Sequence, residues 1–148
     1  IRNPSSKNNG QPCRRIVEFI DIYPTLTELV GIPTPQAVEG HSLVALLDDP
    51  LTRWDRFAIT QVLRPADHRL DTAVMGRSIR TERWRYSDWA EGKKGVELYD
   101  HFADPMEFEN LALNPTRKNK SVMSRLRRLL KQKASGKVPQ TPFNPKRL

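Results

Sequence analysis

Apolar residues recur at helical spacing near both ends of the chain, and apolar and polar residues alternate between them. Near the start, the spacing predicts a helix over residues 21–30. Asp21 is a candidate N-cap, Pro24 is tolerated in a first helical turn, and Gly31 ends the pattern. Before this helix, residues 16–20 fit either a short strand or the entry to the helix. The apolar face of the predicted helix consists of Ile22, Leu26, Leu29 and Val30.

Alternation marks strand segments in the middle of the chain. The stretch 56–62 predicts one strand, 74–89 predicts a hairpin that turns at 81–83, and 96–99 predicts a further strand. A polar loop is expected over 63–73. These segments predict an antiparallel sheet of three or four short strands, and with the helices they indicate an α+β fold. In the second arm of the hairpin, Trp84 and Tyr86 share one face, and Arg83, Arg85 and Ser87 share the other.

A later helix is predicted over residues 119–134, within a basic segment that runs from 117 to 136. Its apolar side is opposite its basic side, which is the pattern of a helix that packs by one face. A shorter helical stretch ends at Pro50, and Gly136 ends the later helix. Three prolines in residues 137–148 predict a disordered tail. The apolar side of the later helix is formed by Val122, Leu126, Leu129 and Leu130.

The formal net charge of +8 is unevenly distributed over the 148 residues. Residues 117–148 carry 11 Lys and Arg and no acidic residue, whereas residues 1–116 carry 14 basic and 17 acidic residues. The basic charge therefore belongs to the C-terminal segment, and a nucleic-acid-binding body is disfavoured. The lone Cys13 excludes an internal disulfide, and no apolar run approaches the roughly 18 residues of a membrane span. The start at Ile1 rather than Met favours a fragment of a longer protein.

Three stretches of the sequence, taken in their order along the chain, indicate a family. They are "VEFIDIYPTLTELVGIPTP" with "EGHSL" after it, then "GRSIRTERWRYSDW", then "ELYDHFADPMEFENLA". Together they resemble the C-terminal end of the sulfatase family, within the alkaline-phosphatase-like superfamily, over roughly residues 1–116. Because "TQVLRP" stands ahead of the second stretch, the chain looks most like the iduronate-2-sulfatase branch.

The resemblance implies a small antiparallel sheet with packed helices, the C-terminal subdomain of an α/β enzyme. Residues 1–116 would be the end of the main domain plus this subdomain, followed by the basic helix 117–136 and the disordered tail 137–148. The resemblance also implies hydrolysis of sulfuric esters, here those of sulfated glycans such as glycosaminoglycans. A missing N-terminal sulfatase domain would be the partner of this region, and a periplasmic or secreted location is expected.

The chemistry of the family needs parts that this chain lacks. The nucleophile is a formylglycine made from a Cys/Ser-x-Pro-x-Arg motif, beside a calcium ion held by acidic residues. Cys13 is followed by Arg-Arg-Ile-Val, and no serine has the required pattern. Asp48 and Asp49 are better explained as solvated turn residues, and His41 as a surface or capping residue. We therefore expect no catalytic residue and no metal site in this chain, which alone would be inactive, and expect calcium and formylglycine in the missing N-terminal part.

The stretch 104–111, Asp-Pro-x-Glu-x-x-Asn-Leu, is expected to be architectural. Its proline disfavours a helical conformation at Asp104, whose carboxylate can accept from backbone N–H groups two or three residues on. Glu107 and Asn110 are expected to satisfy turn donors in the same way. His101, just before the turn, is expected to pack there.

The loop 63–73 holds the candidate substrate-binding residues Arg64, His68 and Arg69. The resemblance implies that this loop can reach the mouth of the pocket. Arg and His suit an anionic, sulfated and carboxylated sugar because their N–H groups form charge-assisted hydrogen bonds. The alternative is a solvated basic loop without a role in binding.

Three functions remain open at the level of the sequence. The chain is the C-terminal part of a sulfuric ester hydrolase, a stand-alone module that binds a polyanion through residues 117–148, or a non-functional remnant of a truncated reading frame. A Cys/Ser-x-Pro-x-Arg motif encoded upstream would favour the first. Salt-sensitive polyanion binding by the chain alone would favour the second, and absence of soluble folded product the third.

Overall fold

The computed structural model describes residues 1–64 and 73–134. The chain divides into two compact units, Ile1–Trp54 and Asp55–Leu148. Among the described helices, none is both long enough and apolar enough to cross a membrane. The tail predicted over 137–148 lies outside the described residues.

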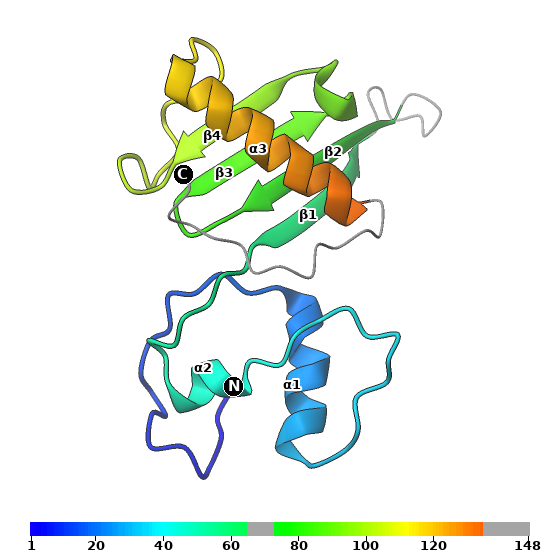
Figure 1. Ribbon diagram of the computed structural model, residues 1–148, viewed down its shortest axis with the longest axis vertical. Coiled ribbons are helices and arrows are strands. Elements are labelled where there is room, and N and C mark those ends of the chain that lie inside the picture. The colour runs from blue at the N-terminus through cyan, green and yellow to red at the C-terminus, as the bar shows by residue number, and fades with distance from the viewer. Residues whose placement is uncertain (65–72, 135–148) are drawn as a thin grey trace. The chain divides into compact units, whose positions relative to one another are not determined.

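Short helices make up the regular structure of the first unit (Figure 1). The 3-10 helix η1 spans Phe19–Asp21 and runs directly into α1, Ile22–Leu29, and α2 spans Val44–Asp48. The helix predicted over 21–30 is therefore confirmed. Of the apolar residues just before it, Phe19 and Ile20 form the helical entry, whereas Ile16 and Val17 lie in neither a helix nor a strand.

Asp21 and Thr25 tie α1 to the loop that follows it, and both side chains are buried. Asp21 Oδ1 accepts from the backbone N–H of His41 at 2.8 Å, and Oδ2 accepts from that of Glu18 at 2.8 Å. The Thr25 hydroxyl donates to the Asp21 carbonyl oxygen at 2.5 Å and accepts from the Leu43 N–H at 2.8 Å. Asp21 thus stands at the N-cap position without capping α1 through its side chain, which corrects the role predicted for it.

The predicted apolar face of α1 is largely exposed. Leu26 and Val30 are 50% and 67% exposed, and Phe19 of η1 is 91% exposed. A helix that buries its hydroxyl side and exposes its leucine side leaves apolar area uncovered. The buried residues of α1 are Pro24, Thr25 and Thr27.

A four-stranded antiparallel sheet, with its strands in the order β1-β2-β3-β4, forms the centre of the second unit. The 3-10 helix η3 (Ala90–Gly92) follows β3, and the long helix α3 (Arg117–Ala134) lies across one face of the sheet (Figure 1). The predicted antiparallel sheet and the α+β class are confirmed. The strands are β1 (Ala58–Arg64), β2 (Val74–Arg80), β3 (Trp84–Trp89) and β4 (Val96–Asp100).

The first strand lies two residues later than predicted. The register pairs Leu63 with Met75 and Arg64 with Val74, so the ladder continues into residues assigned to the loop 63–73. β1 ends where its pairing with β2 ends, and the polarity of the residues at that end does not set the boundary.

The core lies between α3 and the face of the sheet that it covers. The register places Ile79, Tyr86 and Leu98 side by side on three strands, and all three are buried. Because side chains alternate along a strand, the opposite face carries Gly76 and Trp89. The other members of the core cluster are Trp84, Val122, Leu126 and Leu130.

Candidate functional site

The structure places one of the three predicted substrate-binding residues. Arg64 is the last residue of β1 and is exposed, whereas His68 and Arg69 lie outside the described residues. Arg64 pairs with Val74 at the start of β2. The candidate site is therefore the end of the sheet at which β1 leads into the segment 65–72 and β2 returns from it.

The guanidinium group of Arg64 lies over an aromatic ring. Its central carbon is 5.0 Å from the ring centroid of Trp89, within the distance of about 6 Å that a cation–π contact allows. Trp89 ends β3, and β2 lies between β3 and the strand that carries Arg64. Such a contact restrains the guanidinium and leaves its N–H groups able to bind a carboxylate or sulfate oxygen.

Gly76 gives the Trp89 ring its place on the sheet. Gly76 pairs with Val62 on one side and with Trp89 on the other. A Cβ atom at Gly76 would lie 2.5 Å from Cζ3 and 2.7 Å from Cε3 of Trp89. The ring therefore lies directly on the backbone of β2, an approach that only glycine permits.

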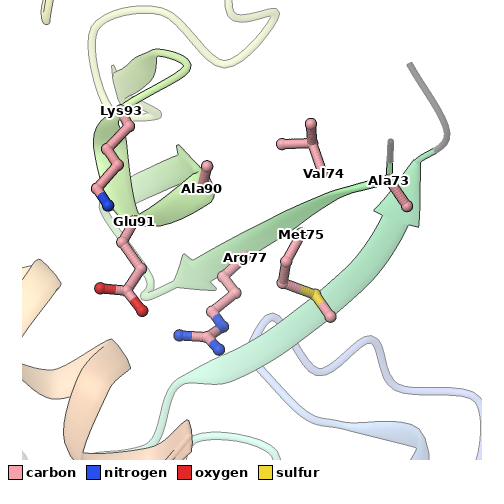
Figure 2. A pocket seen from close by; sticks show the side chains of 7 residues that line it. All are labelled: Ala73, Val74, Met75, Arg77, Ala90, Glu91 and Lys93. Atoms are coloured by element: carbon pink, nitrogen blue, oxygen red, sulfur yellow. The ribbon is translucent and has the colours of Figure 1, made fainter. Parts of the chain in front are cut away.

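A pocket of about 320 Å³ lies at the start of β2. Figure 2 shows Glu91 and Lys93 reaching in from the η3 side, and Met75 and Arg77 from β2. Arg77 Nε is buried and has no hydrogen-bond partner in the described part of the chain. Two cations and one carboxylate suit a small anionic or zwitterionic group. The pocket is lined by Ala73, Val74, Met75, Arg77, Ala90, Glu91 and Lys93.

Polar groups surround Arg77 and connect η3 to α3. Asp88 is the cross-strand partner of Arg77, and burial raises the pKa of Asp88 although Arg127 and Arg77 oppose the shift. The Tyr86 hydroxyl donates to Asp88 Oδ2 at 3.4 Å, and burial raises the pKa of Tyr86 to about 12. Arg127 of α3 donates to the Glu91 carbonyl oxygen at 2.6 Å, which fixes one wall of the pocket to the helix.

The Asp-Pro-x-Glu-x-x-Asn-Leu motif serves the architecture, as the sequence predicts. Asp104 Oδ2 accepts from the Glu109 N–H at 2.9 Å, and bonds from backbone N–H groups lower the pKa of Asp104. Asn110 Oδ1 accepts from the N–H groups of Leu98 at 3.1 Å and Ala112 at 3.0 Å. The asparagine therefore binds the outer edge of β4.

Glu107 has a different role from the one predicted. Its carboxylate forms bonds to side chains instead of turn donors: His101 Nε2 lies 2.5 Å from Oε1, and Arg85 pairs with Oε2. The backbone of Glu107 has a φ of 59°, in the left-handed region. Arg85 also lies 5.5 Å from the ring centroid of Tyr99. His101 thus packs beside the turn as expected.

The described residues do not fit the calcium and formylglycine chemistry that the resemblance implies for the family. Asp49 Oδ1 accepts from the Leu51 N–H at 2.9 Å and Oδ2 from the Thr52 hydroxyl at 3.1 Å, so Asp49 is a turn residue. Cys13 is exposed, and its sulfur lies 3.6 Å from the Pro50 carbonyl oxygen. Within the described segments, no group of three His, Cys, Asp or Glu side chains could hold a metal ion.

Comparison with known proteins decides the family. Residues 1–136 match the family described as "N-sulphoglucosamine sulphohydrolase, C-terminal". The chain belongs to this sulfatase family. Arylsulfatase K of Canis lupus familiaris is 29% identical over 146 residues, which are 95% of this chain and 27% of that protein. Delta 4,5-hexuronate-2-O-sulfatase of Bacteroides thetaiotaomicron is 32% identical over 115 residues, 76% of this chain and 23% of that protein.

A solved structure confirms the same part of the sulfatase fold. The structure of a 2-O GAG sulfatase matches with a TM-score of 0.62 and 28% identity, over 79% of this chain and 24% of that chain. The predicted C-terminal sulfatase region, with its small antiparallel sheet, is thus confirmed. The chain spans about a quarter of the length of the curated relatives described above.

Sequence reasoning missed Trp89, Gly76 and the pocket. A hairpin centred on the predicted turn 81–83 would pair Gly76 with Asp88, whereas the observed register pairs Gly76 with Trp89. A glycine opposite a tryptophan marks close packing of the ring on the backbone. The pocket depends on the turn at η3, where Ala90 and Glu91 both have positive φ angles.

Proposed function

We propose that this chain is the C-terminal region of a sulfatase that hydrolyses sulfate esters of glycans. The observation that carries the proposal is the family match over residues 1–136. The substrate class is supported by two relatives, one named a hexuronate-2-O-sulfatase and one a 2-O GAG sulfatase. A hexuronate carries a carboxylate as well as its sulfate ester, so such a substrate offers a second anion. An iduronate-2-sulfatase-like preference stays a prediction within this class.

Arg64, with His68 and Arg69, is proposed to bind the anionic group of the sugar that is remote from the sulfur atom. Support comes from the exposure of Arg64 at the end of β1 and from its restraint by Trp89. Contacts remote from the bond that breaks supply binding and orientation and leave the chemical step to other groups. The nucleophile and the calcium ion implied by the family resemblance belong, in this proposal, to the missing N-terminal part.

The apolar surface of the first unit gives the proposed N-terminal domain a place to dock. Phe19, Leu26 and Val30 are each at least half exposed. The relatives have about three times more chain than the part matched here. A domain partner that covers this surface removes the cost of leaving it in water, at about 25 cal/mol per Å².

The test uses the full-length protein and two substrates, a 2-O-sulfated hexuronate disaccharide and a small aryl sulfate without a carboxylate. Sulfate release from the disaccharide is expected. Arg64→Ala should lower kcat/KM for the disaccharide about tenfold to a hundredfold and change that for the aryl sulfate much less. The matched control is Arg14→Ala, which removes an exposed arginine of the first unit.

Two results would contradict the proposal. Full-length protein that carries an upstream Cys/Ser-x-Pro-x-Arg motif, converted to formylglycine, yet releases no sulfate would refute the assignment as a sulfatase. Equal losses on both substrates after Arg64→Ala would show that Arg64 acts on folding or on the sulfate pocket.

We further infer that α3 contacts a polyanionic chain. Its 18 residues include eight Lys and Arg and no acidic residue. Basic residues in the first turn oppose the helix dipole, and like charges three or four positions apart repel each other. A helix that keeps basic residues despite this unfavourable electrostatic energy is expected to use them in binding. A sulfated glycan is the polyanion that the family match supports.

A further inference from the structure

Three groups are stacked on the face of the sheet opposite α3: the backbone of Gly76, the ring of Trp89 and the guanidinium group of Arg64. Gly76 supports the Trp89 ring, and the ring supports the guanidinium group. We propose that Trp89 is a positioning residue that holds Arg64 in its binding orientation, and that Gly76 makes this possible. The inference rests on the proposed function of Arg64.

Arg64 needs such a support because the exposed strand that carries it restrains its side chain little. β1 is an edge strand of the sheet, and residues 60–64 are all exposed. An unsupported arginine side chain at a strand end samples many rotamers, and binding an anion must then overcome that loss of freedom. Stacking on the tryptophan limits the rotamers before the ligand arrives.

Trp89 is itself held from three directions. Its ring lies on Gly76, its backbone N–H donates to the Gly95 carbonyl oxygen at 3.1 Å, and its carbonyl oxygen accepts from Lys94 at 3.0 Å. The turn that follows at η3 begins with Ala90, at a φ of 48°. These contacts hold Trp89 in place, whereas Arg64, which stacks on its ring, lies on the exposed edge strand β1.

The experiment measures kcat and KM of the full-length enzyme for the 2-O-sulfated hexuronate disaccharide and for the aryl sulfate. Trp89→Leu should raise KM for the disaccharide about two- to fivefold, the effect of losing an exposed cation–π contact, with kcat unchanged. Trp89→Phe keeps an aromatic ring and should retain most of the affinity. Gly76→Ala should act like Trp89→Leu, because the added methyl group displaces the ring. KM for the aryl sulfate should not change.

Double substitution separates positioning from a direct contact of the tryptophan with the sugar. If Trp89 acts through Arg64, the variant with both Arg64→Ala and Trp89→Leu should be no worse than Arg64→Ala alone. The matched control is Tyr99→Leu, which removes the ring next to Arg85 on the same face of the sheet and should leave KM unchanged. Melting temperatures of all variants identify any loss of fold, and Trp89→Phe, the milder change, keeps the test open if Trp89→Leu is unstable.

The outcomes separate this inference from the proposed function. If Arg64→Ala raises KM and Trp89→Leu does not, the positioning role is refuted and the role of Arg64 stands. Full additivity in the double variant, or an equal effect of Tyr99→Leu, also refutes positioning. If Arg64→Ala has no effect on the disaccharide, the proposed substrate contact is wrong and this inference is wrong with it.

Discussion

The outer edge of β4 supplies the sharpest test of the architectural role of the Asp-Pro-x-Glu-x-x-Asn-Leu motif. β4 is the last strand of the sheet, so one side of it has no strand partner within the described sheet. Asn110 and Leu111 take that place. Asn110 Oδ1 accepts from the Leu98 N–H at 3.1 Å, and the Leu111 N–H donates to the Leu98 carbonyl oxygen at 2.9 Å. Asn110→Ala would expose this edge.

The expected magnitude follows from the bonds that the asparagine forms. Oδ1 also accepts from Ala112 at 3.0 Å, and Nδ2 donates to the Val96 carbonyl oxygen at 3.3 Å. Three hydrogen bonds at about 0.5–1.5 kcal/mol each give a loss of roughly 1.5–4.5 kcal/mol in the free energy of unfolding. The upper half of this range is expected because Leu98 is buried and its N–H would lack a partner. Asn110→Asp retains the acceptor and should lose only about 1 kcal/mol.

The free energy of unfolding is measured by urea titration, followed by the fluorescence of Trp84 and Trp89 in the sheet. Amide hydrogen exchange of β4 supplies a local measurement, in which Asn110→Ala should speed the exchange of Leu98. Asn114→Ala is the matched control, because Asn114 is exposed in the same segment. If Asn110→Ala costs no more than Asn114→Ala and leaves exchange unchanged, the motif does not hold the edge of the sheet.

Three further predictions concern acid stability, self-association and polyanion binding. Burial favours a raised pKa for Asp100, but hydrogen bonds led by those of Arg83 outweigh it and the folded pKa is lowered. This stabilisation is complete above the ordinary value of 3.8 and is lost as pH falls through the folded value, so Asp100→Asn should flatten the acid limb of a urea-stability profile. In sedimentation experiments, Leu26→Asp should reduce self-association of the isolated chain, whose α1 face is exposed; unchanged association would refute the exposed face as the cause. Replacing Lys118 and Lys120 of α3 by Gln should lower the salt concentration that elutes the chain from heparin, and unchanged elution would contradict the α3 assignment. Matched controls replace Lys7 and Arg14 by Gln.

Local patterns predicted most of the fold because its elements depend on local periodicity. β3 alternates between buried and half-buried residues, and α3 directs its three leucines to the core. Errors arose where a long-range partner decided the outcome. The carboxylate of Asp21 bonds to the backbone of His41, twenty residues later, and not to the start of α1. β1 extends to Arg64 because β2 offers a register partner.

The candidate site was predicted only in part for the same physical reason. The sequence indicated Arg64 by its charge and its position in a loop, but its contact with Trp89 joins residues on two strands that are not neighbours. Glu107 was assigned to turn donors, whereas the fold brings Arg85 and His101 to its carboxylate. Charge and spacing in a sequence name the groups that can bind. The sheet register then decides which of them meet.

The strand order of the second unit has a consequence for how this region folds during synthesis. Each strand after β1 pairs with the strand that precedes it in the sequence. The sheet can therefore form strand by strand in the order of synthesis, without pairing between segments that are distant in the sequence. Only α3, made last, must return to close the core over Tyr86. Folding rates should therefore respond mainly to changes in the β2–β3 hairpin, whereas changes at Leu126 should mainly speed unfolding. A nascent chain held before α3 would carry a formed sheet with one apolar face open to chaperones.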